Sequence, residues 1–159
     1  MTKSEKANVL FSKGFNCSQS VLSVFSEEFS LSEDDCLKIA CAFGGGMARR
    51  QLTCGAVTGA LMVLGLNYGM TKGDDISKKI TTYRKTAEFF DAFKKRNGSI
   101  NCMDLLQGLD MNNAADLKKI QELNLFQTIC CTFVKDAVDL VEEMMRQDPA
   151  LILRSGTNP

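Results

Sequence analysis

The sequence predicts an all-α protein, a compact single-domain bundle of several helices around a buried central helix. Apolar residues recur every three or four positions in nearly every segment, the spacing at which side chains share one face of an α-helix. The strict alternation of apolar and polar residues that is typical of a strand is not found. Both prolines, Pro149 and Pro159, lie near the C-terminal end, so the rest of the chain lacks the residue that most strongly interrupts a helix.

Capping and turn residues divide this pattern into eight expected helices. Ser32 precedes three acidic residues, as an N-cap does at the start of a helix. Asn97-Gly98 is typical of a helix end, and residues 44–46 are three glycines that predict a flexible loop. The helices are expected over residues 4–12, 17–29, 33–43, 54–68, 74–96, 102–107, 114–122 and 128–146.

No shift in composition marks a second domain. Residues 1–147 are therefore expected to form a single helical domain, and residues 148–159 a loosely held C-terminal tail.

The segment 54–68 is apolar or small on every side, which predicts a helix that is buried all round. A glycine inside a helix costs about 0.5–1 kcal/mol relative to alanine, so Gly55 and Gly59 are expected to admit a close neighbour. A tight helix crossing is the favoured interpretation. A cofactor lying against the backbone is the alternative.

The segment 74–96 predicts a homodimer. Its apolar stripe contains two adjacent aromatic residues, Phe89 and Phe90, and Phe93 follows one turn later. One helix face can bury only part of this set within its own domain, and the remainder would suit a self-complementary patch. The competing expectation is that one core buries all of these side chains. The stripe consists of Ile76, Ile80, Tyr83, Ala87 and Phe90.

The overall composition excludes several classes of partner. Lys+Arg and Asp+Glu balance at 19 each, so no net field attracts nucleic acid or an anionic membrane. The N-terminal residues lack the apolar run of a signal peptide, and no apolar segment is long enough to span a bilayer. The protein is expected to be cytoplasmic.

The chain has seven cysteines and no histidine. Without histidine there is no Ser–His or Cys–His nucleophile pair and no imidazole ligand for a metal. Cysteines in a cytoplasmic protein serve metal binding or redox chemistry more often than structural disulfides. The odd count agrees, because a closed set of disulfides would leave one thiol unpaired.

Four of these cysteines share a position at the expected start of a helix. The N-terminus of a helix carries unpaired N–H groups and a partial positive charge, which favour the thiolate over the thiol. Thiolates bind soft metals and are the reactive form in disulfide exchange. Three of the four, Cys17, Cys54 and Cys102, directly follow the expected cap residues Asn16, Thr53 and Asn101. The fourth, Cys131, lies in the first turn of the last helix if Thr128 caps that helix.

The other three cysteines fit this pattern less well. Cys36 and Cys41 are five positions apart in one expected helix, among apolar residues, and are expected to be small core side chains. Cys130, beside Cys131, is ambiguous. No CxxC motif is present, so the chain lacks the cysteine spacing of a thioredoxin-type dithiol, of a zinc ribbon and of a ferredoxin. Any site must be assembled by the tertiary fold.

Residues 54–59, with the sequence CGAVTG, resemble the central motif of a bacterial and archaeal family of redox-active proteins labelled by the pattern C-GCAxxG-C-C. The label writes glycine before cysteine, whereas here Cys54 precedes Gly55. Segments 14–19, 43–47, 98–102 and 131–134 resemble the family's other landmarks in order. The resemblance implies a compact helical fold and assigns the family's four cysteines to Cys17, Cys54, Cys102 and Cys131.

Related split-Soret cytochromes look like this domain with added haem and are associated with an iron–sulfur site. Haem is excluded here, because the chain has neither histidine nor a CxxCH motif. The leading prediction is an iron–sulfur cluster that all four thiolates hold, and a two-iron cluster is favoured over a four-iron one. The cluster would serve electron transfer or redox sensing with an unknown partner protein. One alternative is a metal-free protein in which two of the same four thiols cycle between thiol and disulfide. The other is a helical binding module with inert cysteines.

Overall fold

The structure, a computed structural model, describes residues 1–148. This part of the chain is helical, as predicted, and contains no strand, only an isolated antiparallel bridge between Thr53 and Asn101. The predicted tail lies outside the described residues from position 149 onward. The α-helices are α1 (Lys3–Ser12), α2 (Cys17–Ser23), α3 (Glu33–Ala40), α4 (Gly55–Tyr68), α5 (Ile76–Asn97), α6 (Cys102–Leu105), α7 (Ala114–Glu122) and α8 (Cys131–Arg146). Two 3₁₀ segments, η1 (Glu27–Phe29) and η2 (Cys41–Phe43), and a π-helical turn, η3 (Phe126–Cys130), complete the set.

Side-chain caps fix several helix ends where the sequence predicts them. The Ser32 hydroxyl accepts from the backbone N–H of Asp35 at 3.0 Å and starts α3. Gly98 ends α5 in the left-handed conformation, with φ of 88°. The predicted helix 17–29 is interrupted after Ser23, because the next N–H groups bond three residues back and tighten the chain into a 3₁₀ turn.

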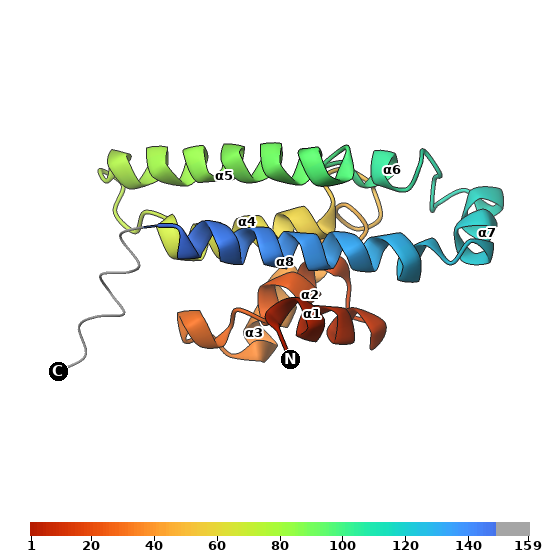
Figure 1. Cartoon of the computed structure of the whole chain (residues 1–159), viewed down its shortest axis with the longest axis horizontal. Coiled ribbons are helices and arrows are strands. Elements are labelled where there is room, and N and C mark those ends of the chain that lie inside the picture. Colours follow the sequence, from red (N-terminus) through yellow and green to blue (C-terminus); the bar gives the residue numbers. More distant parts are fainter. Residues whose placement is uncertain (149–159) are drawn as a thin grey trace.

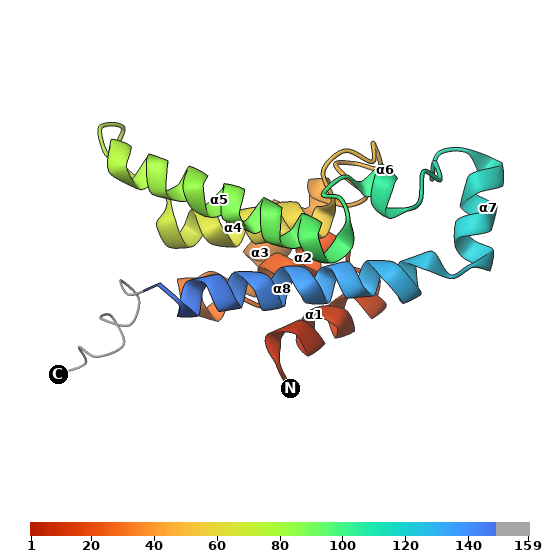
Figure 2. The same ribbon diagram turned by 45° about the horizontal axis from the view of Figure 1, so that its top comes forward.

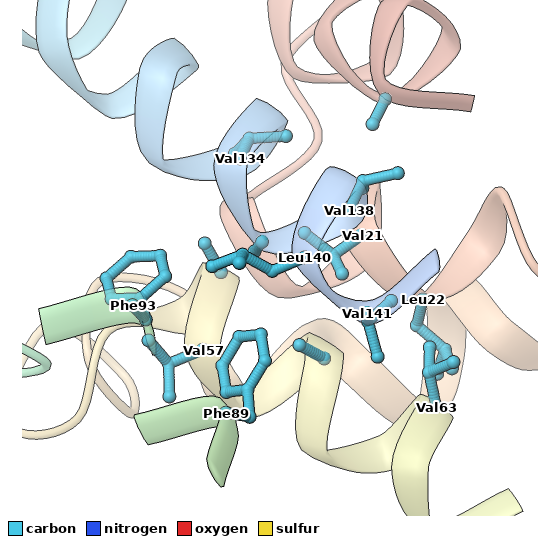
Figure 3. Close-up of a cluster of buried hydrophobic side chains, with 14 of the residues drawn as sticks. Val21, Leu22, Val57, Val63, Phe89, Phe93, Val134, Val138, Leu140 and Val141 are labelled. Atoms are coloured by element: carbon cyan, nitrogen blue, oxygen red, sulfur yellow. The ribbon is translucent and has the colours of Figure 1, made fainter. Parts of the chain in front are cut away.

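Helix α4 lies at the centre of the bundle and packs against α2, α5 and α8, while α1 packs against α8 (Figure 1). Its residues 55–60 are all buried, which confirms the predicted central helix over its first half. The core combines aromatic side chains of α5 with aliphatic side chains of α2, α4 and α8 (Figure 3). Its members include Val21, Leu22, Val57, Val63, Phe89, Phe93, Val134, Val138 and Val141.

Gly59 allows α2 and α4 to cross closely. A Cβ atom at this position would lie 2.9 Å from the backbone oxygen of Ser18 and 2.9 Å from Cβ of Val21. At Gly55, a Cβ atom would lie 3.1 Å from Cβ of Cys17. The favoured interpretation of both glycines, a tight helix crossing, is therefore confirmed, and the crossing brings the start of α4 against the start of α2.

The Gly59→Ala variant is expected to lower the free energy of unfolding by about 1–3 kcal/mol, because the backbone of α2 must move to admit the methyl group. Gly65→Ala is the matched control on the same helix. Nothing lies within 4 Å of its added Cβ, so the variant should gain about 0.5–1 kcal/mol of helix stability. Urea unfolding of both variants measures the difference, and equal stabilities would contradict the tight crossing.

The apolar stripe of α5 faces solvent over its first half. Ile76, Ile80 and Tyr83 are 53%, 62% and 66% exposed. The helix buries Phe89 and Phe93 instead. The alternative in which one core buries the whole stripe is therefore wrong. The first half of α5 diverges from α8 (Figure 2), so that part of the helix has no partner on this face among the described helices.

We propose that a second copy of the chain covers this face. An antiparallel pairing of two α5 helices about Tyr83 would set Ile76 opposite Phe90, Lys78 opposite Glu88 and Ile80 opposite Thr86. Light scattering should give a dimer mass at micromolar concentrations. Ile80→Glu should give the monomer mass, and the control Leu123→Glu, at an exposed position on α7, should leave the dimer intact. A monomer mass for the unchanged protein at every dilution would refute the dimer.

None of the helices within residues 1–148 is both long enough and apolar enough to cross a membrane.

Candidate functional site

Cys17 is the first residue of α2 and is half-buried. The Asn16 side chain caps this helix, because its Oδ1 accepts from the backbone N–H of Gln19 at 3.0 Å. Its Nδ2 donates to the backbone oxygen of Cys41 at 2.9 Å. Asn16 therefore caps the helix as predicted, and it also fixes the start of α2 against η2.

Cys54 and Cys102 are buried and are held together by backbone pairing. The N–H of Cys54 donates to the oxygen of Ile100 at 2.8 Å, and the N–H of Cys102 donates to the oxygen of Leu52 at 2.7 Å. These bonds flank the bridge between Thr53 and Asn101. Both cysteines lie at helix starts as predicted, but the predicted side-chain caps are wrong. Thr53 and Asn101 are extended residues paired with each other, and neither accepts a capping bond.

The glycine loop forms a wall of the site and is not the open, flexible loop that the sequence predicts. Residues 45–49 all have positive φ, between 49° and 66°, a left-handed turn that only glycine adopts without strain. Backbone bonds from Gln51 to Gly45 and from Leu52 to Gly46, at 3.0 and 3.1 Å, close it. A Cβ atom on Gly46 would lie 2.8 Å from Cβ of Cys102. The turn thus packs directly against one of the candidate thiols.

The buried amide of Gln51 ties this loop to the segment after α6. Its Nε2 donates to the oxygen of Leu109 at 2.8 Å, and its Oε1 accepts from the N–H of Met111 at 2.7 Å. Its positioning role is not evident from the sequence, because a glutamine in a loop carries no signal of burial.

Cys130 lies at the same place as three of the predicted cysteines. Cys130 is 8% exposed and lines one cavity with Cys17 and Cys102. Cys131 is half-buried, and its Sγ donates to the backbone oxygen of Gln127 at 2.8 Å, toward the preceding turn. Of the predicted set, the structure thus brings Cys17, Cys54 and Cys102 together, and it places Cys131 outside the cavity lining.

A π-helical turn lies just before Cys131. Helix α8 begins at Cys131, three residues after the predicted start at residue 128, and Thr128 does not cap it. The Thr128 hydroxyl donates to the oxygen of Asn124 at 3.0 Å, within the run that leads into η3. Because a π turn holds more residues than an α turn, it rotates the following side chains about the axis.

Burial dominates the protonation of the four thiols. Desolvation raises the pKa of Cys17 well above its usual range, and the charges of Cys54, Cys130 and Cys102 raise it further. Burial is the larger cause and the neighbouring cysteines are the smaller one, and together they raise the pKa of Cys102 and of Cys130 to about 12. Burial also raises the pKa of Cys54, although N–H groups of Ala56 and Val57 lower it. The expectation of low-pKa thiolates at helix starts is wrong for this site, because desolvation outweighs the helix termini.

The thiols of Cys17, Cys102 and Cys130 line a cavity of about 530 Å³. Cys41 lines it too and is exposed, so its predicted place in the core is wrong, because its helix ends at Ala40 and the chain turns outward into η2. Cys36 is fully buried in the core, as predicted. The remaining lining residues are Phe11, Gly14, Phe15, Asn16, Gly44, Gly45, Ala48, Arg49, Leu106, Met111 and Phe126.

All seven cysteines are free thiols. Within residues 1–148, no three cysteine, aspartate or glutamate side chains stand in an arrangement that would hold a metal ion. The site is therefore a group of neighbouring thiols, protonated at neutral pH, of which Cys17, Cys102 and Cys130 line a shared cavity.

Comparison with known proteins agrees with the resemblance read from the sequence. The sequence model of the family described as "Putative redox-active protein (C_GCAxxG_C_C)" matches residues 15–144. An uncharacterized protein from Archaeoglobus fulgidus is 28% identical over 134 residues, which cover 77% of this chain and 89% of the relative. No solved structure matches the chain. Since the matched region includes every cysteine and nearly all of the helical bundle, the chain belongs to the C_GCAxxG_C_C family of redox-active proteins.

Proposed function

We propose that the chain binds an iron–sulfur cluster of the two-iron class through Cys17, Cys54, Cys102 and Cys130, for electron transfer or redox sensing. The observation that carries the proposal is geometric: Cys17, Cys102 and Cys130 line one cavity, and Cys54 lies beside Cys102 at the bridge, in a chain without histidine. Thiolates are the protein ligands that iron–sulfur clusters use. When bound, such a cluster supplies one-electron oxidation and reduction.

The donor set fits this group in its chemistry. Four buried thiolates would repel one another, and a cationic metal centre among them replaces that repulsion with attraction. The N–H groups of Ala56 and Val57 at the start of α4 are directed at Cys54, and donors of this kind stabilise a ligating thiolate. Because no three of the thiols stand at metal-binding distance in residues 1–148, binding requires them to approach one another.

The chain's other residues position the thiols. Asn16 holds the start of α2, and the bridge beside Cys54 and Cys102 keeps those two segments in register. The left-handed turn at 45–49, tied down through Gln51, covers Cys102 and limits the entry of water.

A second candidate is a metal-free thiol–disulfide protein, which the mutual proximity of the same free thiols also supports. Two of the four would lose two protons and two electrons to an external disulfide or other two-electron oxidant and form one S–S bond.

Anaerobic purification and reconstitution with iron and sulfide separate these candidates. We expect about two iron and two sulfide per chain and a visible charge-transfer spectrum. Cys54→Ser should lose the cluster, and Cys36→Ser, which alters a core thiol away from the site, should keep it. If no iron binds but oxidation removes about two titratable thiols per chain, the thiol–disulfide candidate holds. If neither occurs, the cysteines are inert and both candidates fail.

A further inference from the structure

The cavity contains a thiol that the proposed cluster does not use. Cys41 is exposed, yet it lines the same cavity as Cys17, Cys102 and Cys130. The hydrogen bond from Asn16 Nδ2 to its backbone oxygen holds η2 against the start of α2, next to Cys17. The cavity therefore has one exposed thiol, that of Cys41, at its open edge, with the half-buried Cys17 and the buried Cys102 and Cys130 further in.

The same wall carries an unneutralised positive charge. The Arg49 guanidinium lines the cavity, and its Nη2 donates to the oxygen of Met111 at 3.0 Å. The oxygen of Arg49 accepts from Asn112 Nδ2 at 2.8 Å, so both the side chain and the backbone of Arg49 are anchored. No carboxylate of residues 1–148 forms an ion pair with it, and the cavity lining contains no acidic residue.

These features point to a ligand with a carboxylate, a short apolar body and a sulfur atom. The carboxylate would pair with Arg49, and the apolar part would contact rings such as Phe11 and Phe126, which also line the cavity. The sulfur atom of the ligand would lie next to the thiol of Cys41 at the open edge of the cavity.

We propose that this cavity binds a low-molecular-weight disulfide that carries a carboxylate, and that Cys41 exchanges with it. Cys41 loses its proton to solvent, and its thiolate attacks one sulfur of the small disulfide. The S–S bond of the small molecule breaks, a bond from Cys41 to the attacked sulfur forms, and the departing thiolate takes a proton from water. Cys41 is thereby oxidised and the departing half is reduced. The mixed disulfide lies over Cys17, Cys102 and Cys130 and closes their access to solvent.

This inference is independent of the proposed cluster, because Cys41 is not one of the four thiols assigned to it. It predicts an exchangeable modification of the cavity's edge whether or not iron binds.

The test treats the reduced, full-length protein with dithiodipropionate, which carries two carboxylates, or with the uncharged hydroxyethyl disulfide. Peptide mass mapping follows the adduct on each cysteine over time. We expect Cys41 to react first and Cys36 to stay unmodified. The adduct should also slow alkylation of Cys17 in the unchanged protein, an effect that Cys41→Ser should remove. A first adduct on Cys131 would overturn the proposal.

Charge variants test the role of Arg49. Arg49→Ala should slow the reaction of Cys41 with dithiodipropionate about 3- to 10-fold and leave its reaction with hydroxyethyl disulfide unchanged. Arg49→Lys retains the charge and should retain most of the rate. Arg50→Ala, beside Arg49 but outside the cavity lining, should change neither reaction. Equal rates with dithiodipropionate for Arg49→Ala and the unchanged protein would overturn the carboxylate specificity.

Discussion

The Cys130→Ser variant is expected to bind at least about tenfold less iron than the unchanged protein after anaerobic reconstitution, whereas Cys131→Ser is expected to bind as much. Cys130 is buried and lines the cavity together with Cys17 and Cys102. The sulfur of Cys131 donates to the oxygen of Gln127 and lies outside the cavity lining. The two neighbouring cysteines are therefore expected to differ in role because of their orientation.

Iron and sulfide analysis of both variants, with the visible spectrum of each, measures this difference. Reaction of the two proteins with a thiol reagent before reconstitution supplies a readout without metal. The half-buried Cys131 should react before the buried Cys130, so Cys131→Ser should lose the faster of the two reactions. Loss of iron in Cys131→Ser with retention in Cys130→Ser would restore Cys131 as the fourth ligand.

The sequence placed three of these cysteines at helix starts because a helix start is determined by nearby residues. In the structure Cys17 and Cys102 begin helices, and Cys54 directly precedes one. The choice between Cys130 and Cys131 has no cap residue to guide it. The buried side chains of α8 lie 4, 7, 8, 10 and 11 positions after Cys130 but 3, 6, 7, 9 and 10 positions after Cys131, so helical spacing places Cys130 nearer the buried face. The prediction of Cys131 rested on a cap at Thr128 that the structure does not contain.

The Phe93→Ala variant is expected to lower the free energy of unfolding by about 3–5 kcal/mol. Phe93 is fully buried on α5, and its ring centroid lies 5.9 Å from that of Phe89 and 6.4 Å from that of Phe133 on α8. Removing the ring leaves a cavity at the junction of α4, α5 and α8, which the rigid neighbours fill only in part. This loss is a large share of the stability of a domain of this size.

Urea unfolding followed by circular dichroism measures the cost. Leu123→Ala is the control, because Leu123 is 58% exposed at the end of α7, and its loss should change stability by about 0.5 kcal/mol or less. A Phe93→Ala variant as stable as this control would contradict the core described for α5.

The order and type of the helices were predictable, and the faces they bury were less so. Spacing alone predicts a helix over 74–96, and the structure has one from Ile76 to Asn97. Spacing does not show which part of this helix the chain's own core covers: Ile76, Ile80 and Tyr83 are exposed, whereas Phe89 and Phe93 are buried. The buried face depends on how far α4 and α8 extend beside α5, which is a tertiary property. The left-handed turn at 45–49 could not be predicted from the sequence either, since three of its five residues are not glycine.

The short bridge between Thr53 and Asn101 also determines how the molecule opens. It joins the start of α4 to the chain just after α5, so residues 53–101 form a closed loop, with Cys54 just inside one end and Cys102 just beyond the other. The amide protons of these two cysteines make the bonds that close the loop, and they become free only when its ends separate. In hydrogen exchange the two amides should therefore exchange together, at the rate of the slowest protected amides of α4. The thiols then separate only in rare openings that also release α5 from the rest of the bundle.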